Sequence, residues 1–173
     1  MARHFGRIAR LAAAALCAAI AFALIAAAGL PDLGIVLSLQ QGGVPTLQGK
    51  TLDGTPFSVA AWHGKPIILN FWASWCAPCR DELPALQKLH QAGVQVVGVN
   101  VGEPPVLAAT FAAAYGVTFP NLSDADYYWL RVFRVRTLPT TFFIAADGRV
   151  REVVNGGMSA AELAAKAAEL AKR

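Results

Sequence analysis

One apolar segment, Pro66 to Trp72, constrains the fold of this chain more than any other feature of its sequence. It reads Pro-Ile-Ile-Leu-Asn-Phe-Trp, a nearly continuous apolar run bounded by chain-breaking residues. Because successive strand residues point to opposite faces of a sheet, such a run predicts a strand that is buried on both faces. A second run, Val94 to Val101, predicts another central strand. The sheet that contains them must be covered on both sides, which predicts an α/β architecture.

Helix and hairpin signals alternate with these two strands. Leucines at helical spacing follow the first strand, and Pro84 among them is expected to kink that helix or split off its first turns. Asp-Gly pairs at 53–54 and 147–148 predict two hairpins. The predicted elements are helices at 77–91, 104–115, 125–133 and 159–172, hairpins at 52–57 and at 140–145 with 150–155, and a short extended link at 119–122. A capping box of Ser159 and Glu162 opens the last helix. This order predicts an α/β sandwich around a central mixed sheet, preceded by an extra hairpin.

The N-terminal part of the chain has the pattern of a membrane anchor. Three arginines, at 3, 7 and 10, precede an uncharged run of 20 residues from Leu11 to Leu30, about the length a helix needs to cross a bilayer. Arginines on this flank predict a cytoplasmic N-terminus and an exported C-terminal part. A cleavable signal peptide with a cleavage site near Ala26–Ala28 is the alternative. The predicted organisation is a basic N-terminus at 1–10, a transmembrane signal anchor at 11–30, a linker at 31–43 and a folded domain at 44–173.

Charge argues against a nucleic-acid partner. The chain carries a formal net charge of +4, and without the three leading arginines the remainder is close to neutral. That remainder holds 12 basic and 11 acidic residues, so a nucleic-acid partner is not expected. The basic balance is therefore mainly a signal of membrane topology.

Cys76 and Cys79 are the residues most indicative of chemistry. The third cysteine, Cys17, lies in the apolar N-terminal run, so this pair stands alone in the exported part. Cys76 falls between the end of a predicted buried strand and the start of a helix, where backbone N–H groups and the helix dipole favour a thiolate. A thiolate is the attacking species in disulfide exchange, and Cys79, one helical turn further on, can resolve the mixed disulfide.

Other uses of the cysteine pair are less compatible with the sequence. A zinc site needs two more ligands, and neither a second cysteine pair nor a histidine cluster is present, so no metal is predicted. Attachment of a c-type haem requires histidine after the second cysteine, and position 80 is arginine. A structural disulfide remains an alternative, although so short a loop gains little entropically. No cofactor beyond the redox-active cysteine pair is expected.

Three segments in order along the chain resemble the thioredoxin superfamily, and specifically its bacterial, membrane-anchored TlpA/ResA-like branch. The likeness runs from about residue 42 to the C-terminus. The three segments are Asn70-Phe71-Trp72-Ala73-Ser74-Trp75-Cys76-Ala77-Pro78-Cys79-Arg80, Val99-Asn100-Val101-Gly102-Glu103 and Thr137-Leu138-Pro139-Thr140-Thr141-Phe142-Phe143. The resemblance implies a thioredoxin fold, with a central mixed β-sheet flanked by helices, and an exported domain tethered to the bacterial cytoplasmic membrane.

The resemblance also implies roles for particular residues. Pro139 matches a proline that is cis in the family and packs beside the dithiol, although it is also compatible with the start of a strand. A substrate strand is then expected to pair with the backbone beside it, with Leu138 tuning the site. Trp75 matches an exposed aromatic residue that contacts substrate, whereas Trp72 is expected in the core. The implied substrate-binding residues are Trp75, Pro78, Leu138 and Pro139.

Asn70 marks a departure from many thioredoxins, which carry a buried aspartate six residues before the first cysteine. Because an amide cannot titrate, another base is expected to serve Cys79, and Glu103, directly after the second predicted strand, is the candidate. The alternative for Glu103 is an ordinary solvated acid at a helix start. Asp81 and Glu82, in the first turn of the helix after Cys76, are expected to form a solvated face.

Three functions are compatible with these observations. The favoured one is a reductant that takes electrons from a membrane thiol relay and reduces protein disulfides outside the cytoplasm, such as the CxxCH site of apocytochrome c. An oxidant that introduces disulfides is the second, disfavoured because Ala77-Pro78 lacks the histidine common between the cysteines of such oxidants. The third is a tethered binding or chaperone domain with an incidental disulfide. A monomer is expected, on the membrane or, after cleavage, free in the periplasm.

Overall fold

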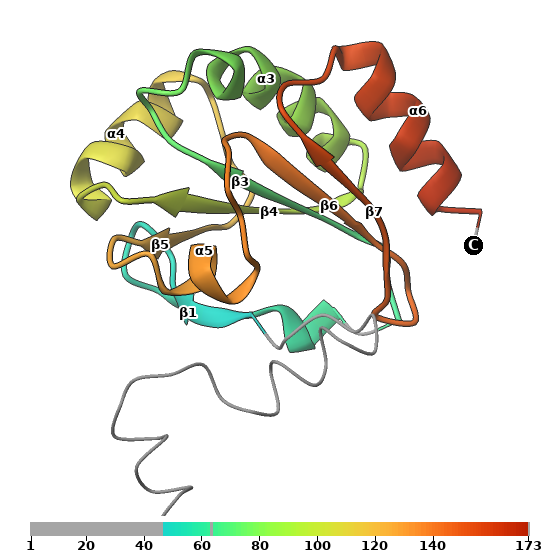
Figure 1. Cartoon of the computed structure of the whole chain (residues 1–173), viewed down its shortest axis with the longest axis horizontal. Helices are drawn as coiled ribbons and strands as arrows, with labels where there is room; N and C mark the ends of the chain where they lie inside the picture. Colours follow the sequence, from blue (N-terminus) through green and yellow to red (C-terminus); the bar gives the residue numbers. More distant parts are fainter. Residues whose placement is uncertain (1–46, 63, 173) are drawn as a thin grey trace, which may run out of the picture. The chain divides into compact units, whose positions relative to one another are not determined.

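The structure, a computed structural model, describes residues 47–62 and 64–172 and is organised around one five-stranded sheet (Figure 1). Strand β3 (Ile67–Trp72) lies at its centre, in the order β5-β4-β3-β6-β7. β4 (Gln95–Val101) and β5 (Asn121–Asp124) run parallel to β3, whereas β6 (Thr140–Ile144) and β7 (Val150–Asn155) continue the other side in antiparallel pairs. The mixed central sheet expected from the sequence is confirmed.

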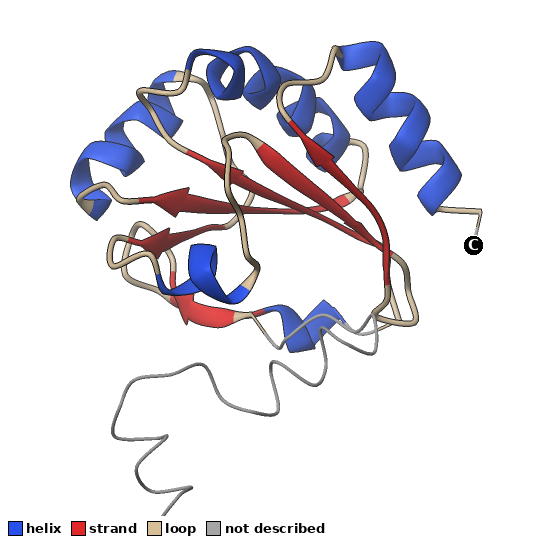
Figure 2. Cartoon of the chain, viewed as in Figure 1, coloured by secondary structure: helices blue, strands red, loops and turns tan. Residues whose placement is uncertain are grey.

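The two faces of the sheet are covered by different elements. Helices α3 (Ala77–Gln91), α4 (Pro105–Ala114) and α6 (Ala160–Leu170) lie along one face (Figure 2). The short helix α5 (Tyr128–Val132), the 3₁₀ helix η1 (Val59–Trp62) and a hairpin of β1 (Gln48–Lys50) and β2 (Pro56–Ser58) lie at the other. Each face contributes its own hydrophobic cluster.

Strand β3 separates these two clusters residue by residue. Ile68 and Trp72 belong to the cluster under α3 and α6, whereas Leu69 and Phe71 belong to the opposite one. This alternation follows from strand geometry. Asn70 shares the parity of Ile68 and Trp72, so the only polar residue of the strand faces α3, where its hydrogen-bond partners lie.

Two predicted segments differ from the structure. The segment 119–122, expected to be a short link, leads into strand β5, which pairs with β4 in the register Gly98↔Asn121. A four-residue strand at the parallel edge of a mixed sheet has too few residues to show a pattern of its own. The helix expected at 125–133 is reduced to α5, because Asp124 closes the preceding strand and accepts hydrogen bonds from the N–H groups of Trp129 and Leu130.

The C-terminal helix and the long helix after the cysteines follow their sequence signals. Ser159 Oγ accepts from the N–H of Glu162, and the Glu162 carboxylate accepts from the N–H of Ser159 at 2.8 Å, so the capping box is confirmed. Helix α3 continues through Pro84 as one element and is not split.

The predicted anchor at 11–30 and linker at 31–43 lie outside the described residues. Within 47–62 and 64–172, no helix combines the length and apolarity needed to span a bilayer.

Gly98 permits a hydrogen bond that crosses the strand β4. Trp72 Nε1 donates to Asn121 Oδ1 at 2.8 Å, joining β3 to β5 over the backbone of Gly98. A Cβ atom at position 98 would lie 1.8 Å from Asn121 Oδ1 and 2.9 Å from Trp72 Nε1. Any side chain larger than hydrogen therefore displaces a buried polar pair.

We expect Gly98→Ala to lower the free energy of unfolding by about 2–4 kcal/mol, because overpacking adds to the loss of a buried hydrogen bond. Urea denaturation followed by tryptophan fluorescence measures it. Asn121→Ala removes the obstructing oxygen, so the double variant should be less destabilised than the sum of the two single variants. Strictly additive losses would contradict this account of the crossing.

Candidate active site

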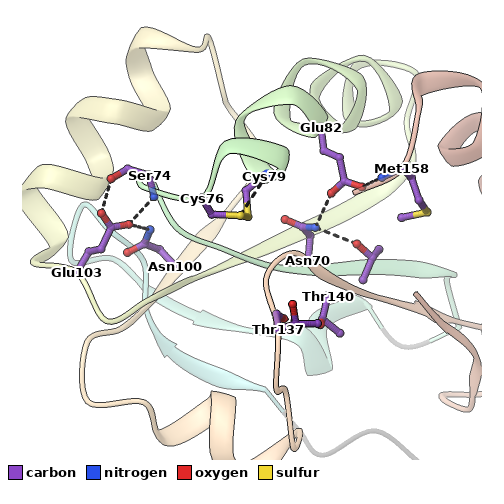
Figure 3. Close-up of a disulfide and its surroundings, with 11 residues drawn as sticks. Asn70, Ser74, Cys76, Cys79, Glu82, Asn100, Glu103, Thr137, Thr140 and Met158 are labelled. Atoms are coloured by element: carbon purple, nitrogen blue, oxygen red, sulfur yellow. Dashed lines mark hydrogen bonds between the residues drawn. A yellow bond between two sulfur atoms is a disulfide. The ribbon is translucent and has the colours of Figure 1, made fainter. Parts of the chain in front are cut away.

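Cys76 and Cys79 lie where β3 gives way to α3 (Figure 3). Cys76 is the N-cap of α3, with Ala77 and Pro78 in the first turn, and its Sγ accepts the backbone N–H of Cys79 at 3.3 Å. The two sulfur atoms form a disulfide with an S–S distance of 1.97 Å. The strand-to-helix position predicted for the pair is confirmed.

The surroundings of the pair distinguish its two sulfurs. Cys79 is 1% exposed and Cys76 5% exposed, whereas the neighbouring Trp75 is 68% exposed and Pro78 is also exposed. Cys76 is therefore the more accessible of the two cysteines, and it follows the exposed Trp75 directly. The Cys79 N–H and the N-terminal end of α3 favour negative charge on the Cys76 sulfur when the pair is reduced.

The segment around Pro139 lies in the same region. The Leu138–Pro139 peptide is cis, as the resemblance implies. Leu138 is half-buried and packs against the cluster that contains both cysteines. Thr140 Oγ1 lies 2.7 Å from the carbonyl oxygen of Thr137, and Gly156 N–H donates to the carbonyl of Pro139 at 2.8 Å. The first bond is internal to the segment, and the second ties the segment to the residue that follows β7.

Glu82 is the buried acid of this site, and the expectation of a solvated face was wrong for it. Asp81 is exposed, but Glu82 is only 1% exposed. Its Oε1 accepts the backbone N–H of Met158 at 2.5 Å, and its Oε2 lies 3.4 Å from Asn70 Nδ2. Burial raises the pKa of Glu82 to about 7, against the opposing effect of these two hydrogen bonds.

A helical signal in the sequence points to this position of Glu82. Residues three or four apart share a helix face, and Glu82 follows Cys79 by three and precedes Leu86 by four. The inward-facing side of α3 therefore includes it. The presence of Asp81 beside it and the preference of acids for the first helical turn concealed this signal.

Asn70 supplies a donor where many thioredoxins carry an acid. Its Nδ2 donates to Thr141 Oγ1 at 2.9 Å and reaches Glu82 Oε2. The amide thus connects β3 to β6 and to α3 without titrating. In Figure 3, Asn70 and Glu82 lie on the same side of the disulfide.

Glu103 lies on the other side of the disulfide from Glu82 (Figure 3). It is 8% exposed, and its carboxylate accepts the backbone N–H of Ser74 at 2.7 Å, the Ser74 hydroxyl, and Asn100 Nδ2 at 2.7 Å. Among the described residues, none of its hydrogen bonds goes to a cysteine. Proton exchange between Glu103 and Cys79 stays a prediction, and the contacts of Glu103 favour a different role.

The rim of the site is largely apolar. Trp75 is the exposed aromatic residue expected beside Cys76, and Trp72 is fully buried, as expected for a core residue. A Cβ atom on Gly157 would lie 3.0 Å from Pro78 Cβ, so the loop before α6 closely approaches the dipeptide between the cysteines. Over residues 47–62 and 64–172, no group of three or more histidine, cysteine or acidic side chains is arranged to hold a metal ion.

Comparisons with known proteins agree with this geometry. Residues 42–153 match the model of the AhpC/TSA family. The chain is 36% identical over 127 residues to the thiol-disulfide oxidoreductase ResA of Bacillus subtilis, covering 70% of this chain and 71% of the relative. It is 38% identical over 112 residues to ResA of Geobacillus thermodenitrificans, where the match covers 62% of this chain and only 64% of the relative.

Solved structures give the same result. A secreted Mycobacterium tuberculosis disulfide oxidoreductase homologous to Escherichia coli DsbE superposes with a TM-score of 0.68 at 34% identity, covering 72% of this chain and 96% of that chain. StoA from Bacillus subtilis superposes with a TM-score of 0.61 at 29% identity, covering 70% and 96%. The chain therefore belongs to the AhpC/TSA family, with the thioredoxin-like fold and the sequence features of its ResA-like members.

Proposed function

We propose that this chain is an extracytoplasmic thiol–disulfide oxidoreductase that works as a reductant of protein disulfides. The observation that carries the proposal is the Cys76–Cys79 disulfide at the N-terminus of α3, with the buried Glu82 one helical turn after Cys79. The relatives that bear the name thiol-disulfide oxidoreductase support it.

The proposed reaction begins with the reduced pair. The Cys76 thiolate attacks one sulfur of a substrate disulfide, which forms a mixed disulfide and releases the other substrate sulfur as a thiolate that takes a proton. Cys79 then loses its proton and attacks Cys76 Sγ. The bond between Cys76 and the substrate breaks, and the second substrate sulfur leaves as a thiolate. Two electrons pass to the substrate, the Cys76–Cys79 disulfide forms, and an external dithiol must reduce it again.

Glu82, in place of Glu103, is the proposed acceptor of the Cys79 proton. It follows Cys79 by three residues on the inward face of α3, and a pKa of about 7 suits proton exchange near neutral pH. Asn70 and Met158 keep its two oxygens in place. A buried carboxylate one helical turn from the resolving cysteine thus takes the role of the aspartate that many thioredoxins carry at the position of Asn70.

Substrate and membrane attachment belong to the same proposal. The favoured substrates are protein disulfides such as the CxxCH site of apocytochrome c, with a membrane thiol relay as electron donor. The apolar rim of Trp75, Pro78 and Leu138 supplies a surface for an extended polypeptide, and the cis Pro139 that follows Leu138 is itself buried. The arginines before the apolar run at 11–30 support tethering on the extracytoplasmic side of the membrane.

Exchange through Cys76 is tested by trapping. In Cys79→Ser the resolving thiol is absent, so substrates are expected to accumulate as mixed disulfides with Cys76, visible as adducts on non-reducing gels that dithiothreitol releases. Cys76→Ser is the matched control and should trap nothing, because Cys79 is buried. Equal adducts in both variants would favour a binding domain with an incidental disulfide.

The reduction potential tests the direction of electron flow. We expect a value near that of thioredoxin, about −270 mV, from equilibration with glutathione or thioredoxin of known ratio. A value near that of a strong oxidant, about −120 mV, would contradict the reductant and favour disulfide introduction.

Glu82→Gln tests the proton acceptor. When Cys76 is first loaded with 2-nitro-5-thiobenzoate, attack by Cys79 releases the coloured thiolate and reports the resolving step alone. Glu82 accepts a proton only when ionised, so this rate should rise with pH through about 7 and then level. Glu82→Gln should lose that rise and be slower by about 10²-fold at pH 8. Asp81→Asn, an exposed neighbour, is the control, and an equal loss there would rule out a specific role of Glu82.

A further inference from the structure

The turn between β3 and α3 is held from the side by the acid that follows β4. Two groups of Ser74, its backbone N–H and its hydroxyl, donate to the Glu103 carboxylate. A third donor, Asn100 Nδ2, lies 2.7 Å from Glu103 Oε2. Ser74 precedes Cys76 by two residues, so these bonds fix the chain directly before the nucleophile.

The hydrogen bonds of Glu103 are those of a carboxylate held in one place. All three partners are neutral donors, and both oxygens accept, as an ionised carboxylate does. Neither the Arg151–Asp147 nor the Lys166–Glu152 ion pair involves Glu103, and among the described residues its hydrogen-bond donors carry no charge. Burial at 8% exposure limits screening by water and salt.

Two opposing fields therefore act on the Cys76 sulfur. The N-terminal end of α3 and the Cys79 N–H stabilise a thiolate. The Glu103 carboxylate, bound to Ser74 two residues before Cys76, destabilises it. A less stable thiolate makes the reduced pair higher in energy relative to the disulfide. The oxidised protein is then harder to reduce, and the reduced protein is the stronger donor.

We propose that Glu103 is a positioning residue that fixes the turn before Cys76. Through its charge, it also lowers the reduction potential of the Cys76–Cys79 pair. This role rests on the proposed disulfide exchange at Cys76 and refines it, since Glu103 then controls the stability of the Cys76 thiolate. Glu103 acts on Cys76 and Glu82 on Cys79, and the two acids lie on opposite sides of the disulfide (Figure 3).

Glu103→Gln in the full-length protein separates charge from shape, since the amide is isosteric and its oxygen can still accept from Ser74. We expect the thiolate of Cys76, titrated by iodoacetamide alkylation rate against pH, to form about one pH unit lower. The equilibrium with glutathione should shift toward the dithiol by up to about tenfold, which corresponds to about 30 mV. Glu103→Asp keeps the charge but moves it, so both of its values should lie between those of the unmodified protein and those of Glu103→Gln.

Two controls decide between charge and structure. Ser74→Ala loosens the same turn but leaves the charge, so it should not shift the glutathione equilibrium toward the dithiol. Asp81→Asn removes an exposed charge near the same helix terminus and should have a much smaller effect than Glu103→Gln. A shift of Ser74→Ala or Asp81→Asn equal to that of Glu103→Gln, or no shift of Glu103→Gln, would overturn the proposal.

The outcome is distinguishable from failure of the proposed function. If the unmodified reduced protein does not exchange with glutathione disulfide, the oxidoreductase proposal fails. If exchange is normal and Glu103→Gln leaves the thiolate titration and the equilibrium unchanged, only the role of Glu103 fails. Should Glu103→Gln not fold, the comparison of Glu103→Asp with Ser74→Ala still decides, because only the former moves the charge.

Discussion

Burial of β3 on both faces is the constraint on which the rest of this structure depends. All six residues of the strand are buried, and a strand of this kind is stable only when layers cover both sides of its sheet. Helices α3 and α6 cover one side, and η1 and α5 cover the other. The strand ends at Trp72, so the chain must turn out of the core there, and the next helix begins at Ala77. Cys76 ends that turn as the N-cap of α3, and Cys79 lies in the first turn of the helix.

The same constraint explains the polar groups around the dithiol. A buried amide on β3 needs partners, and Asn70 finds them in Thr141 and Glu82. A buried carboxylate needs donors, and Glu82 takes the N–H of Met158 from the loop before α6. Residual desolvation keeps the Glu82 pKa near 7. Desolvation of Glu82 next to the central strand thus raises its pKa into the range that suits the proton exchange proposed for Cys79.

The two acids of the site illustrate what sequence spacing reveals and what it conceals. Glu103 was expected near the dithiol because parallel strands end at one edge of a sheet, and it does lie beside the turn before Cys76. Which group it contacts depended on the conformation of Ser74, which has no signature in the sequence. Glu82 was assigned to solvent because it forms an acidic pair with Asp81 and acids favour first helical turns. Its contacts come from residues 12 and 76 positions away, which spacing within a helix does not report.

The sequence by itself determined the α/β class, the central strand, the hairpins, the C-terminal cap and the strand-to-helix position of Cys76 and Cys79, because each depends on local periodicity or on neighbouring residues. Only the tertiary structure decided that 121–124 is an edge strand, that Gly98 makes room for the Trp72–Asn121 hydrogen bond, and that Glu82 and Glu103 divide the two sides of the disulfide. The physical reason is that these features depend on long-range packing. Helical spacing indicates which face of α3 carries Glu82, but the hydrogen-bond partners that an acid meets come from distant residues, and no local pattern encodes them.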